Sequence, residues 1–269
     1  MLVRAILGSG YIGKELAKKW ADQGIYVRCS TTTKEKFEEI RTLTPEVHLL
    51  FGHDLKSVVH FIKGAEALVV TVAPRKAADY EETYLKTAQS LVKACKDLPY
   101  LIYTSSTSIY GDCAGEWVNE KDKVNPETDS GYVLAATEKI YQSLLPSSCK
   151  LCILRLGGIY GPGRSWEDRI IRFQGKTLAG NGGSYTNMIH QLDVINAIDW
   201  CVRNQVEGVY NLVNDSHLTR KSFYDQLAKE QGVATVKWDP SIQSVHAGNK
   251  KVCNKKIKEA GFCFSFPQF

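Results

Sequence analysis

Short apolar stretches alternate with longer amphipathic stretches along the first 156 residues of the chain. The short stretches have the length and composition of buried β-strands, whereas the amphipathic stretches have the spacing of helices with one apolar face. Predicted strands cover residues 2–7, 26–30, 47–51, 67–72 and 150–156, and a further strand begins at Leu101. Predicted helices cover about residues 11–23, 34–43, 80–96 and 131–145. This alternation predicts an α/β fold, a doubly wound parallel sheet with helices on both faces.

The pattern changes beyond Gly157, where loops become longer and short helices surround one more apolar stretch at 208–213. We therefore expect two domains, a core of residues 1–156 and a smaller C-terminal substrate lobe of residues 157–269. The strand near 208–213 is expected to return to the main sheet.

Composition and charge are those of a soluble globular protein, with 43% hydrophobic and 23% charged residues. The net charge is only +5, and the densest basic stretch, Lys250–Lys258, alternates with apolar residues. Such spacing is typical of a solvated helix face, and a nucleic-acid patch is the less favoured alternative. We expect no nucleic-acid partner.

Nothing in the sequence suggests export or membrane insertion. The first strand begins at once, and no apolar run approaches the roughly 18 residues of a membrane span. We therefore expect a cytoplasmic protein with no membrane partner, whose eight cysteines are free thiols. Cys149 and Cys152 form one CxxC, but it opens a predicted strand and lacks a second pair, so we expect no metal site.

A glycine motif follows the first predicted strand. Residues 8–13 read Gly8-Ser9-Gly10-Tyr11-Ile12-Gly13, the pattern GxGxxG. Between a strand and a helix, the first glycine permits a tight turn, the second lets a pyrophosphate approach the backbone, and the third lets helix and strand pack closely. The phosphates then lie at the helix N-terminus. The motif predicts a dinucleotide site in a Rossmann-like fold, and a glycine turn without a ligand is the alternative.

The residues after the second strand indicate which dinucleotide is bound. NAD-binding proteins usually have an acid there, which accepts hydrogen bonds from the ribose hydroxyls. This chain instead reads Cys29-Ser30-Thr31-Thr32-Thr33-Lys34, with no carboxylate before Glu35. Hydroxyls and a lysine suit a 2′-phosphate better, so Thr31, Thr32 and Lys34 are predicted to bind NADP in preference to NAD. The alternative is that Ser30–Thr33 only cap the next helix.

The fifth strand ends in a run of hydroxyl side chains. Residues 101–111 read LIYTSSTSIYG, so that an apolar stretch leads into five consecutive hydroxyl residues. In an open α/β sheet, ligands bind at the carboxyl ends of the strands. We therefore expect Thr104 and Ser105 beside the cofactor, and Ser106 in contact with cofactor or substrate.

The chain resembles the short-chain dehydrogenase/reductase superfamily, in its extended epimerase/dehydratase branch. The resemblance rests on the glycine motif, on LIYTSSTSIYG, on LRLGGIYGPGR at 154–164 and on NMIHQLD at 187–193. It implies an NAD(P)-dependent oxidoreductase or epimerase/dehydratase that acts on a sugar nucleotide or a small polar carbonyl compound.

The resemblance extends to two further strand ends. It implies that Asp54 and Leu55, after the third strand, contact adenine, although an exposed helix N-cap is the alternative role of Asp54. Small residues at the end of the fourth strand, Val72, Ala73 and Pro74, would let the ribose lie against the backbone.

The resemblance also implies a catalytic hydroxyl residue, a tyrosine and a lysine. Ser106 takes the hydroxyl position and Tyr132 the tyrosine position, where a phenol can act as general acid or base. The family's lysine lies four residues after the tyrosine. Here that residue is Ala136, and the nearest lysine, Lys139, comes seven residues after Tyr132.

Glu138 suggests a second register for this helix. Family helices usually carry a glutamate eight residues after the tyrosine, whereas Glu138 follows Tyr132 by six. Alignment on Glu138 would place Ser130 at the tyrosine position, and Tyr132 would then be an aromatic residue that lines the pocket.

Polar residues of the C-terminal lobe allow two interpretations. His190 and Asp193 are expected to cap a helix and brace the lobe rather than to catalyse. Three arginines and an asparagine could bind an anionic substrate, although a solvated basic face also explains the arginines. These residues are Arg164, Arg169, Arg172 and Asn187.

The departure from the Tyr/Lys motif leaves two functions open. The first is an NADP-preferring oxidoreductase or epimerase-like enzyme with a small-molecule substrate. The second is a catalytically silent NADP-binding sensor or regulator, and a plain scaffold comes third. A homodimer is one candidate assembly.

Overall fold

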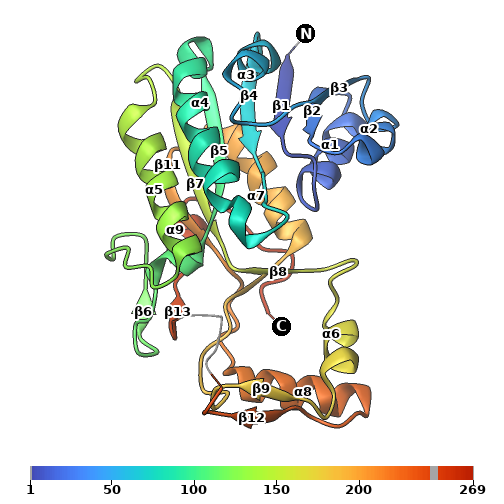
Figure 1. The fold of residues 1–269 in the computed structure, drawn as a ribbon, viewed down its shortest axis with the longest axis vertical. Helices are drawn as coiled ribbons and strands as arrows, with labels where there is room; N and C mark the ends of the chain where they lie inside the picture. Colours follow the sequence, from blue (N-terminus) through green and yellow to red (C-terminus); the bar gives the residue numbers. More distant parts are fainter. Residues whose placement is uncertain (1, 243–247, 269) are drawn as a thin grey trace. The chain divides into compact units, whose positions relative to one another are not determined.

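The strand order of the main sheet determines where a ligand can bind. The computed structural model describes residues 2–242 and 248–268 (Figure 1). Seven strands form one sheet in the order β11-β7-β5-β4-β1-β2-β3. They are β1 (Val3–Leu7), β2 (Tyr26–Thr31), β3 (Glu46–Leu49), β4 (Ala65–Val70), β5 (Tyr100–Ser106), β7 (Lys150–Leu156) and β11 (Gly208–Leu212). The order reverses between β1 and β4, and open α/β sheets bind ligands at the carboxyl ends of strands beside such a reversal.

Helices cover both faces of this sheet. The longer ones are α1 (Gly13–Asp22), α2 (Lys34–Arg41), α3 (Leu55–Ile62), α4 (Thr87–Ala94), α5 (Asp129–Leu144) and α7 (Gln191–Asn204). Short turns of 3₁₀ type lie at η1 (Ala77–Asp79), η3 (Cys95–Asp97) and η4 (Thr107–Tyr110), and η2 (Glu81–Lys86) is a π-helical turn. The Rossmann-like, doubly wound fold predicted from the sequence is thereby confirmed.

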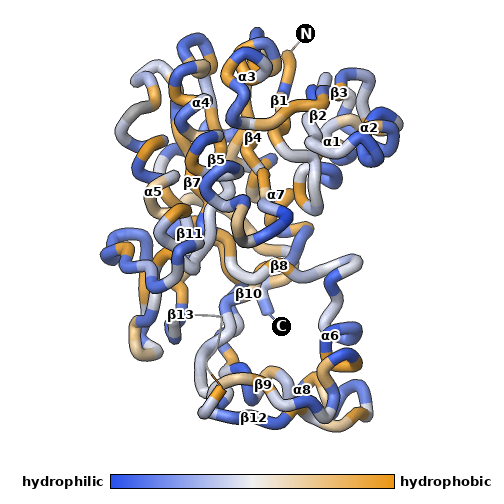
Figure 2. The backbone as a smooth tube through the Cα atoms, in the orientation of Figure 1, coloured by the Kyte–Doolittle hydropathy of each residue, from blue (hydrophilic) through white to orange (hydrophobic). Residues whose placement is uncertain are grey.

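Apolar side chains of β1 alternate between the two faces of the sheet, so helices must cover both faces. Ala5 and Leu7 of β1 belong to a buried cluster with Phe61 of α3, Leu91 of α4 and Tyr141 of α5. Successive side chains of a strand point to opposite faces, so the residue between Ala5 and Leu7 faces the other layer of helices. Figure 2 shows the resulting pattern, with hydrophobic tube along β1 and β4 and hydrophilic tube along much of α2.

The second face packs on α1 and α7. Arg4 of β1 lies over the Trp20 ring of α1, 5.0 Å from its centroid. The Trp20 indole donates a 2.8 Å hydrogen bond to the fully buried Asp199 of α7. Because this donor and acceptor come from helices 179 residues apart, the bond fixes α7 to the layer that α1 occupies.

Two helices differ from the sequence prediction. The helix expected over 80–96 is divided into η2, α4 and η3, and the ring of Tyr84 in the π-helical turn packs edge-on against Tyr103 of β5. Helix α3 was not predicted. Its buried residues Val58, Phe61 and Ile62 have the i, i+3, i+4 spacing of an apolar helix face, which was the signal for it.

The chain divides into two units that interleave along the sequence. One contains Met1–Ser106, Asp129–Arg155 and Ile195–Tyr210, and the other contains Thr107–Thr128, Leu156–Val194 and Asn211–Phe269. The sequence analysis expected a single boundary near residue 157. The difference arises because segments that follow the carboxyl ends of β5 and β7 contribute to the second unit, and the chain later returns to the sheet through α7 and β11.

The second unit has its own small sheets and apolar clusters. Parallel two-stranded sheets pair β8 (Gly158–Tyr160) with β10 (Met188–His190), β9 (Thr177–Ala179) with β12 (Lys237–Asp239), and β6 (Trp117–Val118) with β13 (Lys251–Val252). Its helices are α6 (Trp166–Phe173), α8 (Arg220–Gln231) and α9 (Lys255–Glu259). An aromatic cluster that includes Trp166 and Phe223 packs α6 against α8.

The part of the chain that the structure describes contains no helix long and apolar enough to cross a membrane. Within the same residues, no group of three or more His, Cys, Asp or Glu side chains could hold a metal ion. All eight cysteines are free, and Cys152 of β7 lies with its sulfur 3.9 Å from that of Cys201 in α7. This contact places Cys152 in the apolar core.

Candidate functional site

The glycine motif forms a tight turn between β1 and α1. Gly8 has φ +98°, and a Cβ there would lie 2.9 Å from the backbone nitrogen of Val72. A Cβ on Gly13 would lie 2.4 Å from the Gly8 carbonyl oxygen. The Gly10 N–H donates to the Gly8 carbonyl at 2.9 Å. Gly8 must therefore be glycine because its φ is positive, and Gly13 must be glycine because the Gly8 carbonyl lies too close for a Cβ.

Hydrogen bonds fix this turn to the neighbouring strands. The Gly8 N–H donates to the Ser30 hydroxyl of β2 at 3.0 Å, and the Ser9 N–H donates to the Ser30 carbonyl at 2.8 Å. On the other side, the Thr71 hydroxyl donates to the Gly8 carbonyl at 2.7 Å. The sequence analysis did not select Ser30 or Thr71, because these bonds join positions distant in the sequence.

The second glycine leaves open space where a phosphate would approach. A Cβ on Gly10 would meet no atom within 4 Å, in contrast to Gly8 and Gly13. Ile12 is the N-cap of α1, and no side chain caps that end of the helix. Tyr11 is half-buried and Ile12 is buried. This cradle fits a pyrophosphate, which would occupy the space beside Gly10 and accept hydrogen bonds from the N–H groups at the start of α1.

Hydroxyl and basic side chains surround the carboxyl end of β2. Thr31 is buried, and its hydroxyl accepts a 3.2 Å hydrogen bond from the Thr33 N–H. Thr32 and Lys34 are exposed. Thr33 is the N-cap of α2, but its hydroxyl does not cap the helix and instead accepts a hydrogen bond from the guanidinium of Arg75. Thr33 therefore occupies the N-cap position of α2, but its side chain does not form the hydrogen bond of a helix cap.

Asp54 caps helix α3. Its carboxylate accepts hydrogen bonds from the Lys56 N–H at 3.1 Å, the Ser57 N–H at 3.4 Å and the Ser57 hydroxyl at 2.6 Å. The bond from the Ser57 hydroxyl, followed by the backbone bonds, holds the pKa of Asp54 below its usual value. The capping role of Asp54 is confirmed, whereas the adenine contacts of Asp54 and of the exposed Leu55 stay predictions.

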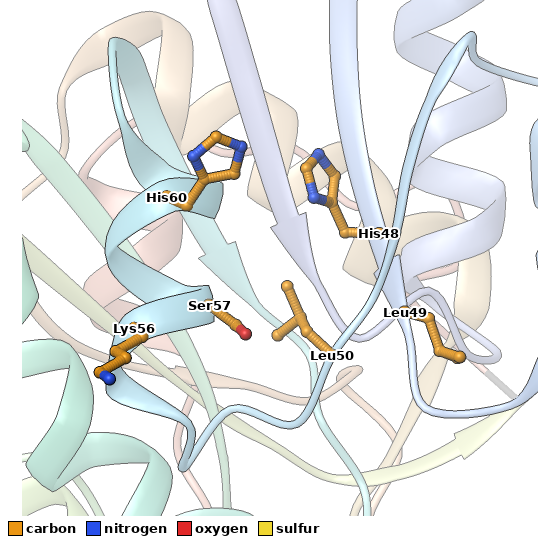
Figure 3. A pocket seen from close by; sticks show the side chains of 6 residues that line it. All are labelled: His48, Leu49, Leu50, Lys56, Ser57 and His60. Carbon is orange, nitrogen blue, oxygen red and sulfur yellow. The ribbon is translucent and has the colours of Figure 1, made fainter.

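A shallow pocket of about 330 Å³ lies between β3 and α3. Its lining residues are His48, Leu49, Leu50, Lys56, Ser57 and His60 (Figure 3). None of the predicted cofactor residues lines this pocket, so it contributes nothing to the dinucleotide assignment.

The carboxyl ends of β4 and β5 lie side by side in the sheet. The Thr104 hydroxyl donates to the Val70 carbonyl at 3.1 Å, which fixes the end of β5 to β4. Ser105 is buried and Ser106 is half-buried. Beyond β4, Val72 and Pro74 are half-buried and Ala73 is exposed. The structure therefore brings the predicted residues of β1, β4 and β5 to one edge of the sheet.

A buried ion pair sets the register of α5. Glu138, with 3% of its surface exposed, pairs with Arg155 of β7, with 4% exposed. The Arg155 Nη2 lies 2.7 Å from the Glu138 Oε2, and its Nε lies 3.1 Å from the Oε1. One and two turns before Glu138, on the same helix face, are Leu134 and Ser130, of which Leu134 is buried.

Tyr132 lies on the opposite face of α5. Its side chain is 60% exposed, and Ala136 and Lys139, which share its face, are exposed as well. The structure thus places Ser106 at the sheet edge and Tyr132 on the solvent side of its helix. The register based on Glu138 agrees with the buried ion pair, and the acid/base role of Tyr132 stays a prediction.

His190 and Asp193 have structural partners in the second unit. The fully buried Asp193 carboxylate accepts hydrogen bonds from the backbone N–H groups of Ser265 at 2.7 Å and Phe266 at 3.0 Å. The Leu192 N–H donates to Nδ1 of His190 at 3.2 Å, and the His190 ring packs 3.8 Å from the Phe266 ring. Burial lowers the pKa of His190. The expected bracing role of this pair is confirmed.

The side chains expected to bind an anionic substrate also have partners. The Asn187 amide accepts from the Val252 N–H at 2.7 Å and donates to the Lys250 carbonyl at 2.9 Å. Arg169 donates to the Tyr224 hydroxyl at 2.8 Å, and Arg172 lies over the Phe173 ring. Asn187 therefore holds the strand that contains Val252. Anion binding by the arginines, including Arg164, stays a prediction.

Comparison with known proteins decides the family. Residues 6–213 match the model of the "NAD dependent epimerase/dehydratase family". The chain belongs to this family. It is also 34% identical to Protein YeeZ of Escherichia coli K12 over 277 aligned positions, which cover 98% of this chain and 96% of YeeZ.

Solved structures share the fold of this chain. A conserved protein of unknown function from Silicibacter pomeroyi superposes with a TM-score of 0.80 at 23% identity, over 100% of this chain and 95% of that one. UDP-glucose 4-epimerase from Thermus thermophilus, solved in complex with NAD, gives a TM-score of 0.81 at 19% identity, over 98% and 94%. The resemblance to the extended short-chain dehydrogenase/reductases is confirmed, and a nicotinamide dinucleotide is the cofactor that the family supports.

Proposed function

We propose that the chain binds NADP, in preference to NAD, along the carboxyl edge of β1, β2, β4 and β5. The observation that carries the proposal is the glycine turn, which is hydrogen-bonded to β2 and β4 while the space beside Gly10 stays open. A pyrophosphate there would place the adenosine ribose beside the end of β2. Thr31, Thr32 and Lys34 lie at that end, with no acid to favour the free 2′-hydroxyl of NAD.

The proposed reaction is a hydride transfer on a small polar carbonyl compound or a sugar nucleotide, in an oxidoreductase or epimerase/dehydratase-like enzyme. When bound, the dinucleotide supplies the hydride donor or acceptor. Ser106, half-buried at the end of β5, would donate a hydrogen bond to the carbonyl oxygen and polarise the bond. Thr104 and Ser105 would line the cofactor side of the same edge.

The geometry of α5 does not favour proton transfer by Tyr132. A tyrosine with a pKa near 10 needs a nearby cation to work as a general acid at neutral pH. Ala136 stands where the family has its lysine, and Tyr132 is 60% exposed. The acid/base role of Tyr132 is therefore left out of the proposed mechanism and stays a prediction from the resemblance.

The arrangement of α5 also favours a second function, a catalytically silent NADP-binding sensor. The ion pair of Glu138 and Arg155 directs Ser130 and Leu134 to the face that would otherwise carry the tyrosine and lysine. Serine and leucine at these two positions provide neither the phenol nor the ammonium group that the proton transfer of the family requires. In a sensor, the intact glycine turn would bind the dinucleotide without turnover.

One assay separates the two functions. NADPH oxidation is measured with a panel of aldehydes, ketones and oxidised sugar nucleotides for the wild type, Ser106→Ala and the control Ser108→Ala. For an enzyme, we expect turnover that falls about a hundredfold in Ser106→Ala and stays close to wild type in Ser108→Ala. Binding of NADPH without oxidation by any carbonyl favours the sensor. Turnover that is equal in all three proteins contradicts the role of Ser106.

A further inference from the structure

Arg75 links two loops that meet at the end of β2. It follows Pro74 in the segment after β4, and its guanidinium Nη2 donates to the hydroxyl of Thr33, 42 residues earlier. Thr33 lies between the buried end of β2 and the first residue of α2. The guanidinium is therefore held at the same strand end as Thr31 and Lys34.

No carboxylate neutralises the positive charge at this strand end. Among the described residues, neither Arg75 nor Lys34 takes part in an ion pair within 4.0 Å. The acid of α2 that does bind a cation, Glu39, pairs with Lys14 of α1 at 3.0 Å. The first acid after β2, Glu35, is exposed and forms no ion pair with a described residue within 4.0 Å. Two cations and three threonines thus share a place where NAD-binding proteins carry an acid.

The glycine turn determines what a ligand would present to these cations. The turn is bonded to Ser30 of β2 through both Gly8 and Ser9, so a pyrophosphate beside Gly10 lies next to β2. The adenosine ribose then reaches the end of that strand. A guanidinium at this point can give two parallel N–H bonds to a phosphate, a geometry that a lysine ammonium cannot match.

We propose that Arg75 binds the 2′-phosphate of NADP and determines the preference of the chain for NADP over NAD. The inference rests on the proposed function, because it requires that a dinucleotide occupies the glycine turn. Thr33 acts as a positioning residue that holds the guanidinium over the end of β2. A different role, in which Arg75 only ties the two loops together, predicts equal effects on ligands with and without the 2′-phosphate.

Two ligands that differ only in this phosphate test the proposal. Adenosine 2′,5′-bisphosphate and adenosine 5′-monophosphate are titrated calorimetrically into the full chain. The proteins are the wild type, Arg75→Gln, Arg75→Lys and the control Arg41→Gln. Arg41 is an exposed residue in the last turn of α2, so its replacement removes the same charge.

The bisphosphate should lose about tenfold or more in affinity on Arg75→Gln, since a charge-assisted contact to phosphate is removed. Arg75→Lys should lie between the wild type and Arg75→Gln, because it keeps the charge and loses the paired bonds. The monophosphate should change less than about twofold, and so should both ligands on Arg41→Gln. Equal losses for both ligands on Arg75→Gln would instead assign Arg75 the role of a loop tie and overturn the proposal.

Failures of the two proposals are distinguishable. If the wild type prefers the bisphosphate and Arg75→Gln keeps that preference, the assignment of Arg75 is overturned and the NADP site stands. If the wild type binds both ligands equally well, the NADP preference and the role of Arg75 are both overturned. If it binds neither ligand, the dinucleotide function itself fails.

Discussion

The glycine turn after β1 and the helix α5 differ in how far each matches the chemistry of the family. In the turn, Gly8 is required by its positive φ and Gly13 by a close backbone contact, while the space beside Gly10 is open. In α5, the register set by the buried pair of Glu138 and Arg155 places Ser130 and Leu134 where the family has its tyrosine and lysine. The proposed cofactor site depends on backbone geometry that the turn provides, whereas the proton transfer of the family depends on side chains from which α5 departs.

Cofactor binding and proton transfer therefore depend on different regions, the glycine turn and α5. Cofactor binding uses N–H groups and space, which the turn provides regardless of the neighbouring side chains. Proton transfer needs a phenol and an ammonium group four residues apart on one helix face, and the residues one and two turns before Glu138 are Leu134 and Ser130. The comparison predicts that dinucleotide binding and turnover can be separated by single substitutions.

The largest expected effect is on the stability of α5. Glu138→Gln removes the carboxylate that pairs with the buried Arg155 and should lower the free energy of unfolding by about 3–5 kcal/mol in urea denaturation, because breaking a buried ion pair is strongly destabilising. The control is Glu259→Gln, which breaks an exposed i, i+4 pair with Lys255 and should cost less than about 0.5 kcal/mol. Equal effects of the two substitutions would mean that the pair does not anchor the helix.

A smaller effect is expected at Tyr132. Because its side chain is 60% exposed on the face opposite Glu138, Tyr132→Phe should change stability by less than about 0.5 kcal/mol. If turnover is detected, the substitution should reduce it by no more than about threefold, against about a hundredfold for Ser106→Ala. Equal losses in both variants would assign Tyr132 the proton and would restore the side-chain half of the family chemistry.

The smallest effect is expected at Asp54, the N-cap of α3 and a predicted cofactor residue. The Ser57 hydroxyl bond and the backbone bonds lower its pKa in the folded state, so its stabilising effect is full above the unfolded pKa of about 3.9. That effect disappears as the pH falls through the folded pKa. The urea midpoint should therefore fall more steeply below about pH 4 in the wild type than in Asp54→Asn. Parallel curves for the two proteins would contradict the cap.

The sequence predicted those parts of the fold that depend on continuous patterns. The strand expected at 150–156 is β7 with the same bounds, because the apolar run of residues 151–154 marks a buried strand. The glycine motif was recognised because its residues are consecutive in the sequence and lie between a predicted strand and a predicted helix. Helix α3 was missed although Val58, Phe61 and Ile62 carry its apolar spacing, since the helix is only eight residues long.

Contacts between distant segments could not be predicted in the same way. The sequence analysis used Glu138 to question the register of α5, but its partner Arg155 lies 17 residues later, in strand β7. Arg75 and Thr33 are 42 residues apart and meet only when β2 and β4 lie in one sheet. The interleaved units have the same origin, because a single boundary in the sequence cannot describe a chain that returns to its first unit.

Binding of the dinucleotide at the glycine turn is the central claim, and Gly10→Ala tests it most directly. A Cβ at Gly10 meets no protein atom within 4 Å, so the unliganded variant should unfold at the wild-type temperature. With NADP at a hundred times its dissociation constant, the wild type should gain about 2.7 kcal/mol, a smaller gain being expected with NAD at the same concentration. Gly10→Ala should show little or no shift with either nucleotide. An equal NADP shift in both proteins, or none in the wild type, would contradict the account.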